Sequence, residues 1–323
     1  MGMSALARRR LLFPAAAVLL IIASFFYLLS PAQQQQHLAL PSQDQSLPSD
    51  VPIPRQIWQI FFPPPGATTL KKSTFFSADW LHMAPGYTYT MVSDQEAASI
   101  INTYYADRPE IGATFHALTN PALKSDFMRY LILAARGGTY SDVDTKPLVP
   151  LESWLPASIR RTTRLIIALE YDETIDRHTD QTIHEVQFCQ WTISAAPHHP
   201  LLTRMVDRAL ADLLAVARDQ NTDVAHAVFS DMHVLNTTGP VAWSENVFEF
   251  LQERDRSLGG WLDFAGIREP RYFGDVAVLP LESFRGDWRD DWGTWLDWRN
   301  GRKVLVRHFY KGSWRIVKLP GQG

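Results

Sequence analysis

The stretch that decides the fold is PALKSDFMRYLILAARGGTYSDVDT, residues 121–145. Its first part places apolar residues at steps of three and four, which is typical of one face of a helix: Leu123, Phe127, Tyr130, Leu131 and Ala134. Gly137 then supplies the kind of residue at which helices commonly end. Residues 139–143 favour a β-strand, so the stretch predicts a helix over 121–136 that leads directly into a strand.

Segments on both sides repeat this alternation. Strands are predicted within IPRQIWQI (53–60), within YTYTMVS (87–93), at 165–169 and at VLVRH (304–308), and further helices at 95–105 and 201–217. Strands alternating with helices predict an α/β fold with a central, mostly parallel sheet. In such sheets ligands bind beyond the carboxyl ends of strands, and Asp142 and Asp144 lie where one strand is predicted to end.

Composition narrows the function classes. The chain has 323 residues, of which 46% are hydrophobic, so it can bury the core of one large domain or two small ones. A net charge of -3 provides no general attraction to nucleic acid. The one cysteine, Cys189, excludes an internal disulfide and a thiolate zinc cage. Any metal site therefore uses carboxylate, imidazole or carbonyl ligands.

The N-terminal region predicts a membrane anchor. Residues 11–29, LLFPAAAVLLIIASFFYLL, carry no charge and as a helix would span the hydrocarbon core of a bilayer. Three arginines precede this segment, and by the positive-inside rule they keep residues 1–10 in the cytosol. A cleaved signal peptide is the alternative, although the apolar run is longer than such peptides usually carry.

A stem and a lumenal domain follow in this interpretation. Residues 30–50 are rich in Gln, Pro and Ser and contain few large apolar residues, which predicts a flexible stem. The folded catalytic domain is then expected to span 51–323.

Asp142 and Asp144 form a D-x-D triplet. On an extended segment, residues two apart point to the same side, so both carboxylates can converge on one cation while Val143 turns into the core. Carboxylate oxygens suit Mg²⁺ or Mn²⁺, which in turn bind diphosphate oxygens. Chance alone produces a D-x-D roughly once or twice in a chain of this composition, so the interpretation depends on the surroundings of the triplet.

Asp126 and Arg129 are three residues apart on the helix that precedes this strand, so they share one helix face. Two interpretations stay open from the pattern alone. The pair is either a surface ion pair or a pair that hydrogen-bonds the hydroxyl groups of a donor sugar.

The stretch resembles the S-D-x-x-R-Y and G-G-x-Y-x-D-x-D signature of glycosyltransferase family 32, which includes the fungal initiation-specific α-1,6-mannosyltransferases of the Golgi. The resemblance extends to four further segments: IPRQIWQI (53–60), FCQWTISAAPHHP (188–200), LNTTGPVAW (235–243) and VRHFYKGSW (306–314). It therefore covers most of the chain after the predicted stem.

This resemblance implies a Rossmann-like GT-A fold and a metal-dependent, retaining transfer. The implied donor is GDP-mannose, with Mn²⁺ or Mg²⁺ as the cofactor, and the implied acceptor is a mannose-containing N-glycan. It further implies a single-pass type II protein of the Golgi membrane with a lumenal catalytic domain, and partners within a complex of Golgi glycosyltransferases.

The resemblance also implies roles for particular residues. Asp142 and Asp144 hold the metal and the diphosphate, and Asp126, Arg129 and Tyr140 line the donor site. The residue that completes the metal shell lies near the C-terminus of GT-A enzymes, and His308 is the candidate, although on its own it reads as an ordinary strand histidine.

Three further site residues have competing interpretations. Trp58 contacts the nucleotide base or simply packs a buried strand. Gly239, within Thr238-Gly239-Pro240, forms a tight turn against the donor or only ends a structural element. Glu170 follows an apolar strand, which places it on the acceptor side, whereas its acidic neighbours read as a loop. Asn236 begins an N-glycosylation sequon whose use would conflict with a pocket-lining role.

Several alternatives stay open. The acceptor is an N-glycan in the first interpretation, or inositol-phosphoceramide or another acceptor of mannose or galactose in the second. A non-catalytic, membrane-anchored glycan-binding protein is the rival from another class. Retention proceeds either by a same-face route, in which the leaving phosphate receives the acceptor proton, or through a covalent intermediate on Glu170 or another acid.

Overall fold

The computed structural model describes five parts of the chain, namely residues 51–62, 76–176, 178, 182–285 and 304–310. They belong to one unit, Ser49–Gly323. The predicted tail (1–10), membrane anchor (11–29) and stem (30–50) lie outside the described residues and stay predictions. Within the described part, no helix combines the length and the apolar character that crossing a membrane requires.

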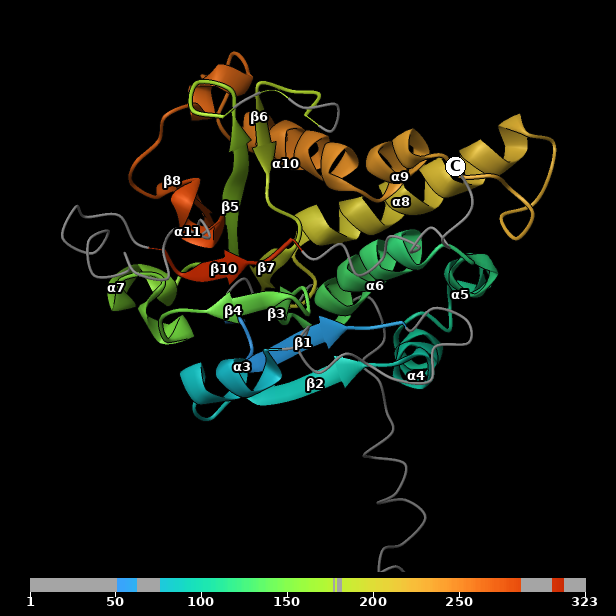
Figure 1. The fold of residues 1–323 in the computed structure, drawn as a ribbon, viewed down its shortest axis with the longest axis horizontal. Coiled ribbons are helices and arrows are strands. Elements are labelled where there is room, and N and C mark those ends of the chain that lie inside the picture. Colours follow the sequence, from blue (N-terminus) through green and yellow to red (C-terminus); the bar gives the residue numbers. More distant parts are fainter. Residues whose placement is uncertain (1–50, 63–75, 177, 179–181, 286–303, 311–323) are drawn as a thin grey trace, which may run out of the picture. The chain divides into compact units, whose positions relative to one another are not determined.

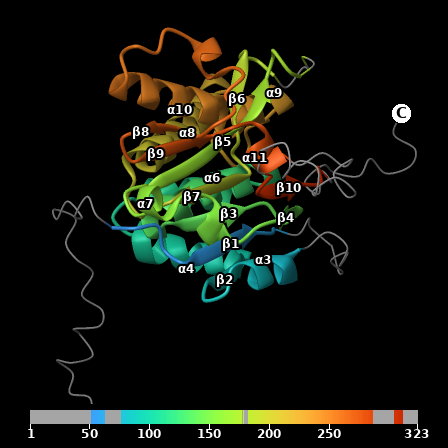
Figure 2. The ribbon, with the colours of Figure 1, turned by 90° about the vertical axis from the view of Figure 1, so that its left-hand side faces the viewer.

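A mixed eight-stranded sheet organises the described residues, in the order β2-β1-β3-β7-β5-β9-β8, with β6 paired to β5 (Figure 2). Its strands are β1 (Gln56–Ile60), β2 (Thr88–Val92), β3 (Gly138–Ser141), β5 (Leu165–Asp172), β6 (Val186–Phe188), β7 (Thr192–Ala195), β8 (Arg271–Phe273) and β9 (Val276–Leu279). Figure 1 shows the twist of the sheet, because β1 and β2 lie across the view while β5 runs up it.

The strand directions agree with a mostly parallel sheet. β1 is parallel to both β2 and β3, and β5 is parallel to β9. β7 lies between β3 and β5 and is antiparallel to each. Five of the described strands, β2, β1, β3, β5 and β9, therefore share one direction, while β7, β6 and β8 oppose it. The sequence did not predict this inserted strand.

Helices cover both faces of the sheet. One face packs into a core with α4 (Asp94–Tyr104), α5 (Pro109–Ala117), α6 (Pro121–Arg136), α8 (Pro200–Asp219), α9 (Asp231–Thr237) and α10 (Pro240–Arg254). The second core contains residues of α3 (Ser77–Met83), η2 (Leu151–Ser153), α11 (Glu282–Arg285) and β10 (Val306–His308), and lies near α7 (Ala157–Arg160). Ile57 belongs to this second core and Trp58 to the first, because successive strand residues point to opposite faces.

Helix α6 has the bounds that its apolar spacing predicts. Asn120 begins it, with a side-chain oxygen that accepts from the N–H of Ala122 at 2.9 Å, and Gly137 ends it. Gly137 and Gly138 have φ angles of 63° and 102°, which side chains rarely adopt. A Cβ at Gly138 would also lie 2.7 Å from the carbonyl oxygen of Gln56. The glycine pair therefore allows the abrupt change from helix to strand.

Candidate active site

Asp142 and Asp144 lie in a tight turn and not on an extended strand. β3 ends at Ser141, and the backbone N–H of Thr145 donates to the carbonyl of Asp142 at 3.2 Å. The Thr145 hydroxyl donates to the same carbonyl at 2.5 Å. The predicted strand over 139–143 was wrong in its last two residues. Val143 is buried as expected, but the turn, and not strand alternation, brings the two carboxylates together.

The third member of this cluster comes from the far end of the sequence. β10 pairs antiparallel with β4 (Thr145–Pro147), which places His308 opposite Thr145. Its Nε2 lies 3.1 Å from Oδ1 of Asp144 and 4.0 Å from Oδ2 of Asp142. One ligand atom from each of the three residues lies within 4.8 Å of the others. The structure thus brings together the three residues that the sequence proposed as metal ligands.

The chemistry of this triad fits a divalent cation such as Mn²⁺ or Mg²⁺. Two carboxylates and one imidazole are ligands that these ions accept. The side chain of Asp144 is buried and that of His308 is 10% exposed, whereas that of Asp142 is 26% exposed, so the cluster opens toward solvent at Asp142. Burial alone would lower the pKa of His308, but its bond with Asp144 and the charges of Asp144, Asp142 and Glu170 raise that pKa above its ordinary value.

Asp126 and Arg129 form a buried ion pair beside the triad. Their side chains are 8% and 5% exposed, and Arg129 Nη2 lies 2.6 Å from Asp126 Oδ1. The same Nη2 lies 3.5 Å from Oδ1 of Asp142, and Nη1 donates to the carbonyl of Gln190 at 3.1 Å. The surface ion-pair interpretation was therefore wrong. The guanidinium instead links the helix α6 to the carboxylate turn.

Burial controls the ionisation of this pair. It raises the pKa of Asp126 to about 6, together with the nearby charge of Asp142, while Arg129 and a hydrogen bond from Thr238 act in the opposite direction. Burial would lower the pKa of Arg129, but the negative charges of Asp126 and Asp142 outweigh it, so the pKa of Arg129 rises. A cation that stays charged next to an acid near its titration point is an arrangement common at functional sites.

Tyr140 packs against Arg129 of this pair and orients Asp142. Its hydroxyl donates to Oδ1 of Asp142 at 2.5 Å, and its ring centroid lies 4.7 Å from the guanidinium carbon of Arg129. Burial raises the pKa of the Tyr140 hydroxyl well above its ordinary value, so it remains a hydrogen-bond donor. Tyr140 is only 1% exposed, so its hydroxyl holds the Asp142 carboxylate from the side of the protein interior.

Two residues between β6 and β7 hold the site together, and sequence reasoning gave them no role. The carbonyl of Trp191 accepts from the N–H of Asp142 at 2.9 Å, and its ring centroid lies 4.5 Å from that of His308. Gln190 accepts from the hydroxyl of Tyr130 at 2.7 Å, in addition to the bond from Arg129. In the sequence, the F-C-Q-W-T resemblance was the signal that could have identified this segment as part of the site.

Glu170, the acceptor-side candidate, is tied to this segment. The indole N–H of Trp191 donates to Oε1 of Glu170 at 2.9 Å. Burial raises the pKa of Glu170, against the effects of His308 and of the bond from Trp191. Glu170 therefore lies on the Trp191 side of the triad, within its electrostatic reach.

The other two predicted residues, Trp58 and Gly239, make their hydrogen bonds to groups outside the triad. Trp58 is 2% exposed and donates its indole N–H to the carbonyl of Gly137 at 2.8 Å, at the beginning of β3. Its neighbour Gln59 instead reaches the turn, because its amide donates to the carbonyl of Asp142 at 2.8 Å. The structure thus places Trp58 in a packing role, and contact with a nucleotide base stays a prediction.

Gly239 connects α9 to α10. Its N–H donates to the carbonyl of Val234 at 2.8 Å, and a Cβ there would lie 2.6 Å from that oxygen. The preceding residue, Thr238, is the one that reaches the site. Its hydroxyl donates to Oδ2 of Asp126 at 3.4 Å, and its carbonyl accepts from Tyr130 at 2.9 Å. Asn236, two residues earlier, is exposed.

Comparisons with known proteins match the region that contains the D-x-D triplet and most of the chain. A family model described as "Glycosyltransferase sugar-binding region containing DXD motif" matches residues 73–160, which include Asp142 and Asp144. An initiation-specific alpha-1,6-mannosyltransferase of Schizosaccharomyces pombe is 30% identical over 284 residues, covering 86% of this chain and 68% of the relative. One of Candida albicans is 26% identical over 294 residues, covering 83% of this chain and 74% of the relative.

A solved structure, "PaToxG Glycosyltransferase", is 16% identical and covers 64% of this chain and 73% of its own, with a TM-score of 0.44.

Proposed function

Because the chain belongs to the DXD-containing glycosyltransferases of the initiation-specific α-1,6-mannosyltransferase type, we propose that it transfers mannose from GDP-mannose to a mannose-containing N-glycan. That it is a glycosyltransferase follows from the family itself, which sets aside the non-catalytic glycan-binding alternative. The observation that carries the finer proposal is the convergence of Asp142, Asp144 and His308 beside the buried Asp126–Arg129 pair.

Each residue of the site is assigned a role in the proposed reaction from the contacts that it makes. Asp142, Asp144 and His308 would hold the divalent cation, which when bound neutralises the negative charge that develops on the leaving diphosphate. Tyr140 and the backbone carbonyl of Trp191 fix Asp142 from its side chain and its N–H respectively.

Asp126 and Arg129 would hydrogen-bond the hydroxyl groups of the donor sugar. Their mutual bond fixes both groups before the sugar arrives, so little conformational freedom is lost on binding. The guanidinium lies 3.5 Å from Oδ1 of Asp142, which places the proposed sugar contacts next to the proposed metal site.

Glu170 would contact the acceptor hydroxyl in this proposal. Its position beside Trp191 and the burial that raises its pKa support a carboxyl group that can hydrogen-bond in either protonation state. Retention by a same-face route needs no nucleophile from the protein, since the leaving phosphate receives the acceptor proton. Glu170→Gln should then keep measurable transfer, whereas a covalent route through Glu170 would lose it.

The setting of this activity is also proposed. The family relationship and the strand directions support a GT-A fold for 51–323. The uncharged segment 11–29 and the arginines before it support a single-pass type II protein of the Golgi membrane, with a lumenal catalytic domain and other Golgi glycosyltransferases as partners.

The decisive experiment measures GDP release from GDP-mannose by the purified chain, with Mn²⁺ or with chelator, and with or without a mannose-rich N-glycan. We expect Mn²⁺-dependent release that the glycan stimulates. The double variant Asp142→Ala, Asp144→Ala should lose this release while remaining folded by circular dichroism. Glu269→Ala, which removes an exposed carboxylate elsewhere, is the matched control and should stay active.

Release assays with different acceptors distinguish the alternative functions. Release stimulated by inositol-phosphoceramide and not by the N-glycan would refute the acceptor while retaining the donor. Full activity in the Asp142→Ala, Asp144→Ala variant would refute the site. A folded wild-type protein that releases no GDP would refute GDP-mannose as the donor.

A further inference from the structure

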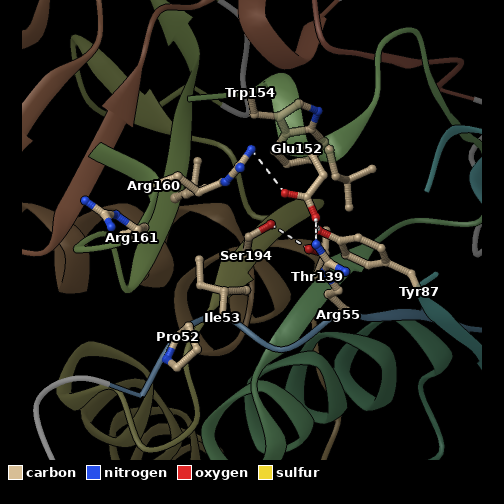
Figure 3. Close-up of a pocket in the computed structure, with 12 residues that line it drawn as sticks. Pro52, Ile53, Arg55, Tyr87, Thr139, Glu152, Trp154, Arg160, Arg161 and Ser194 are labelled. Carbon is tan, nitrogen blue, oxygen red and sulfur yellow. Dashed lines mark hydrogen bonds and ion pairs between the residues drawn. The ribbon is translucent and has the colours of Figure 1, made fainter. Parts of the chain in front are cut away.

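A hollow lies near the starts of β1, β2 and β3, whereas the carboxylate turn follows the end of β3; Figure 3 shows the residues that line the hollow. It measures about 220 Å³ and its lining includes Arg55, Tyr87, Thr139, Glu152, Arg160 and Ser194. Arg55 and Tyr87 precede β1 and β2, and Thr139 lies near the start of β3, whereas Asp142 follows the end of β3. At about 3.3 Å per residue, Thr139 and Asp142 are separated by about 10 Å of strand.

The floor of this hollow is polar where a sheet core is usually apolar. Ile57, Thr139, Ser194 and Ile166 form one row across four adjacent strands. The two central residues are hydroxylic and 2% and 3% exposed, and Oγ1 of Thr139 lies 2.8 Å from Oγ of Ser194. Two hydroxyl groups carry two protons, and their mutual bond uses one of them. Among the described residues neither hydroxyl makes another side-chain hydrogen bond, so one proton stays available to a ligand in the hollow.

The wall carries more hydrogen-bond donors than acceptors. Glu152 accepts from Arg55 and Arg160, each at 3.1 Å, and from the hydroxyl of Tyr87 at 3.2 Å (Figure 3). Each guanidinium has five N–H groups and no acceptor, so a single carboxylate satisfies only a minority of them. Glu152 thereby holds both arginines at the hollow without neutralising them. The surplus of donors and the local positive charge suit an oxyanion.

We propose that this hollow binds a phosphate group, with Arg55 and Arg160 at its wall and the Thr139–Ser194 hydroxyl pair at its floor. Guanidinium groups match the oxygens of phosphate through paired hydrogen bonds, and the volume accommodates a tetrahedral anion. The site is independent of the proposed transfer reaction, because in the described part of the chain no hydrogen bond or ion pair links its residues to the triad or to the Asp126–Arg129 pair.

The phosphate group can come from two sources, a soluble phosphate and a phospholipid headgroup. Pro52 and Ile53, near the start of the described residues, also line the hollow.

The test is calorimetric titration of the full chain in chelator, so that phosphate cannot bind through a metal ion at Asp142. Inorganic phosphate should bind saturably, and Arg160→Gln should weaken that binding about 10-fold or more, because a charge-assisted hydrogen bond is lost. Thr139→Val keeps the shape of the floor and should also weaken binding. The matched control, Arg268→Gln, removes an exposed arginine elsewhere and should bind as the wild type does.

The second arm uses dihexanoyl phosphatidic acid and dihexanoyl phosphatidylcholine as monomers. Tighter binding of the first than of inorganic phosphate, lost in Arg160→Gln, supports the headgroup source, and equal binding supports the soluble source. If neither inorganic phosphate nor phosphatidic acid binds saturably, or if Arg160→Gln and Thr139→Val bind both as the wild type does, the proposal is wrong. Arg55→Gln provides a second test of the wall if Arg160→Gln fails to fold.

Discussion

At the scale of single residues, Arg129 joins the two parts of the candidate active site. One guanidinium contacts Asp126 on its own helix, the carbonyl of Gln190 between β6 and β7, and Asp142 in the turn after β3. A planar group with several fixed donors can make these contacts together, and a flexible ammonium cannot. The geometry therefore depends on arginine and not only on positive charge.

Arg129→Lys should accordingly reduce both stability and turnover. One or two charge-assisted hydrogen bonds are lost in the core, so we expect a destabilisation of about 1–3 kcal/mol. GDP release should fall at least about 10-fold, since each 1.4 kcal/mol of lost transition-state stabilisation costs that factor. Urea unfolding and the release assay measure these effects. Arg204→Lys, in an exposed pair with Glu249, is the control and should change stability by less than about 0.5 kcal/mol. An Arg129→Lys protein as stable and active as the wild type would contradict this account.

The side chain of Trp191 supports the site through two different groups, its ring and its indole N–H, which substitution can separate. Trp191→Phe keeps a ring against His308 but loses the indole N–H that binds Glu170. We expect it to bind Mn²⁺ within a few-fold of wild type and to turn over more slowly, because Glu170 loses its hydrogen bond from Trp191. Trp191→Ala removes both groups and should lose about 10–100-fold in Mn²⁺ affinity, the usual range for a residue that supports metal ligands.

Calorimetric titration with Mn²⁺ and the release assay on the same samples test this separation. Trp261→Phe, at a tryptophan that stacks on Phe248, is the control and should resemble the wild type in both. Wild-type Mn²⁺ affinity in folded Trp191→Ala would show that the ring does not support His308.

The sequence predicted the metal ligands of the site better than the residues that hold those ligands in place. The three metal ligands could be recognised because carboxylate and imidazole groups bind metals and because the residues belong to motifs: Asp142, Asp144 and His308. Trp191 and Gln59 act through a backbone carbonyl, an indole N–H and an amide, and these groups are equally common in ordinary cores. Their roles depend on which strand lies next to which, and local sequence does not contain that information.

At the scale of elements, Asp275 in the turn between β8 and β9 connects several segments. It lies 3.5 Å from Nε2 of His199 at the start of α8, 2.9 Å from Nη1 of Arg254 at the end of α10, and 3.7 Å from Nη1 of Arg164 before β5. Partial burial would raise its pKa, but His199 and Arg254 lower the pKa of Asp275 to about 2. One carboxylate thus holds two helices to the sheet.

This lowered pKa predicts a pH dependence of stability. Below its unfolded pKa of 3.8, the unfolded state binds a proton that the native state still excludes, so stability falls as pH drops from about 4 to about 2. Asp275→Asn removes this contribution. The difference in unfolding free energy between wild type and Asp275→Asn should shrink from about 2 kcal/mol at pH 6 to about 1 kcal/mol at pH 3. Urea unfolding at both pH values measures it.

Glu269→Gln, in an exposed segment near β8, is the control and should unfold as the wild type does at both pH values. A difference between wild type and Asp275→Asn that is equal at pH 6 and pH 3 would exclude the charged carboxylate as its cause.

Element prediction succeeded where the pattern was clear, as for α6 and for the short strands β1 and β2, and failed for β6 and β7. Helix α6 has sixteen residues with a clear apolar face, a polar N-cap and a glycine stop, and its bounds were predicted without error. β6 and β7 have three and four residues, all buried, so they show no alternation of apolar and polar positions. The antiparallel insertion of β7 therefore had no local signal.

At the scale of the whole molecule, the candidate metal site joins the turn after β3 to a strand near the C-terminal end of the described residues. A cation that binds all three ligands binds the folded state and not the unfolded one. Mn²⁺ at about 100 times its dissociation constant should therefore stabilise the fold by about 2.7 kcal/mol. Thermal unfolding in Mn²⁺ and in chelator measures this shift.

The double variant Asp142→Ala, Asp144→Ala should show no shift with Mn²⁺, whereas Glu269→Ala should keep it. An equal shift in the double variant would place the stabilising ion elsewhere. This measurement does not depend on the donor or the acceptor, so it tests the metal site even if the proposed substrates are wrong.

The pairing of β10 with β4 also has a consequence for the order of synthesis. His308 follows Asp144 by 164 positions, so a chain emerging from the ribosome exposes both carboxylates long before the imidazole exists. A nonsense mutation anywhere between them leaves a chain that carries both aspartates but lacks the imidazole. Metal capture by all three ligands is thereby postponed until translation has passed residue 308.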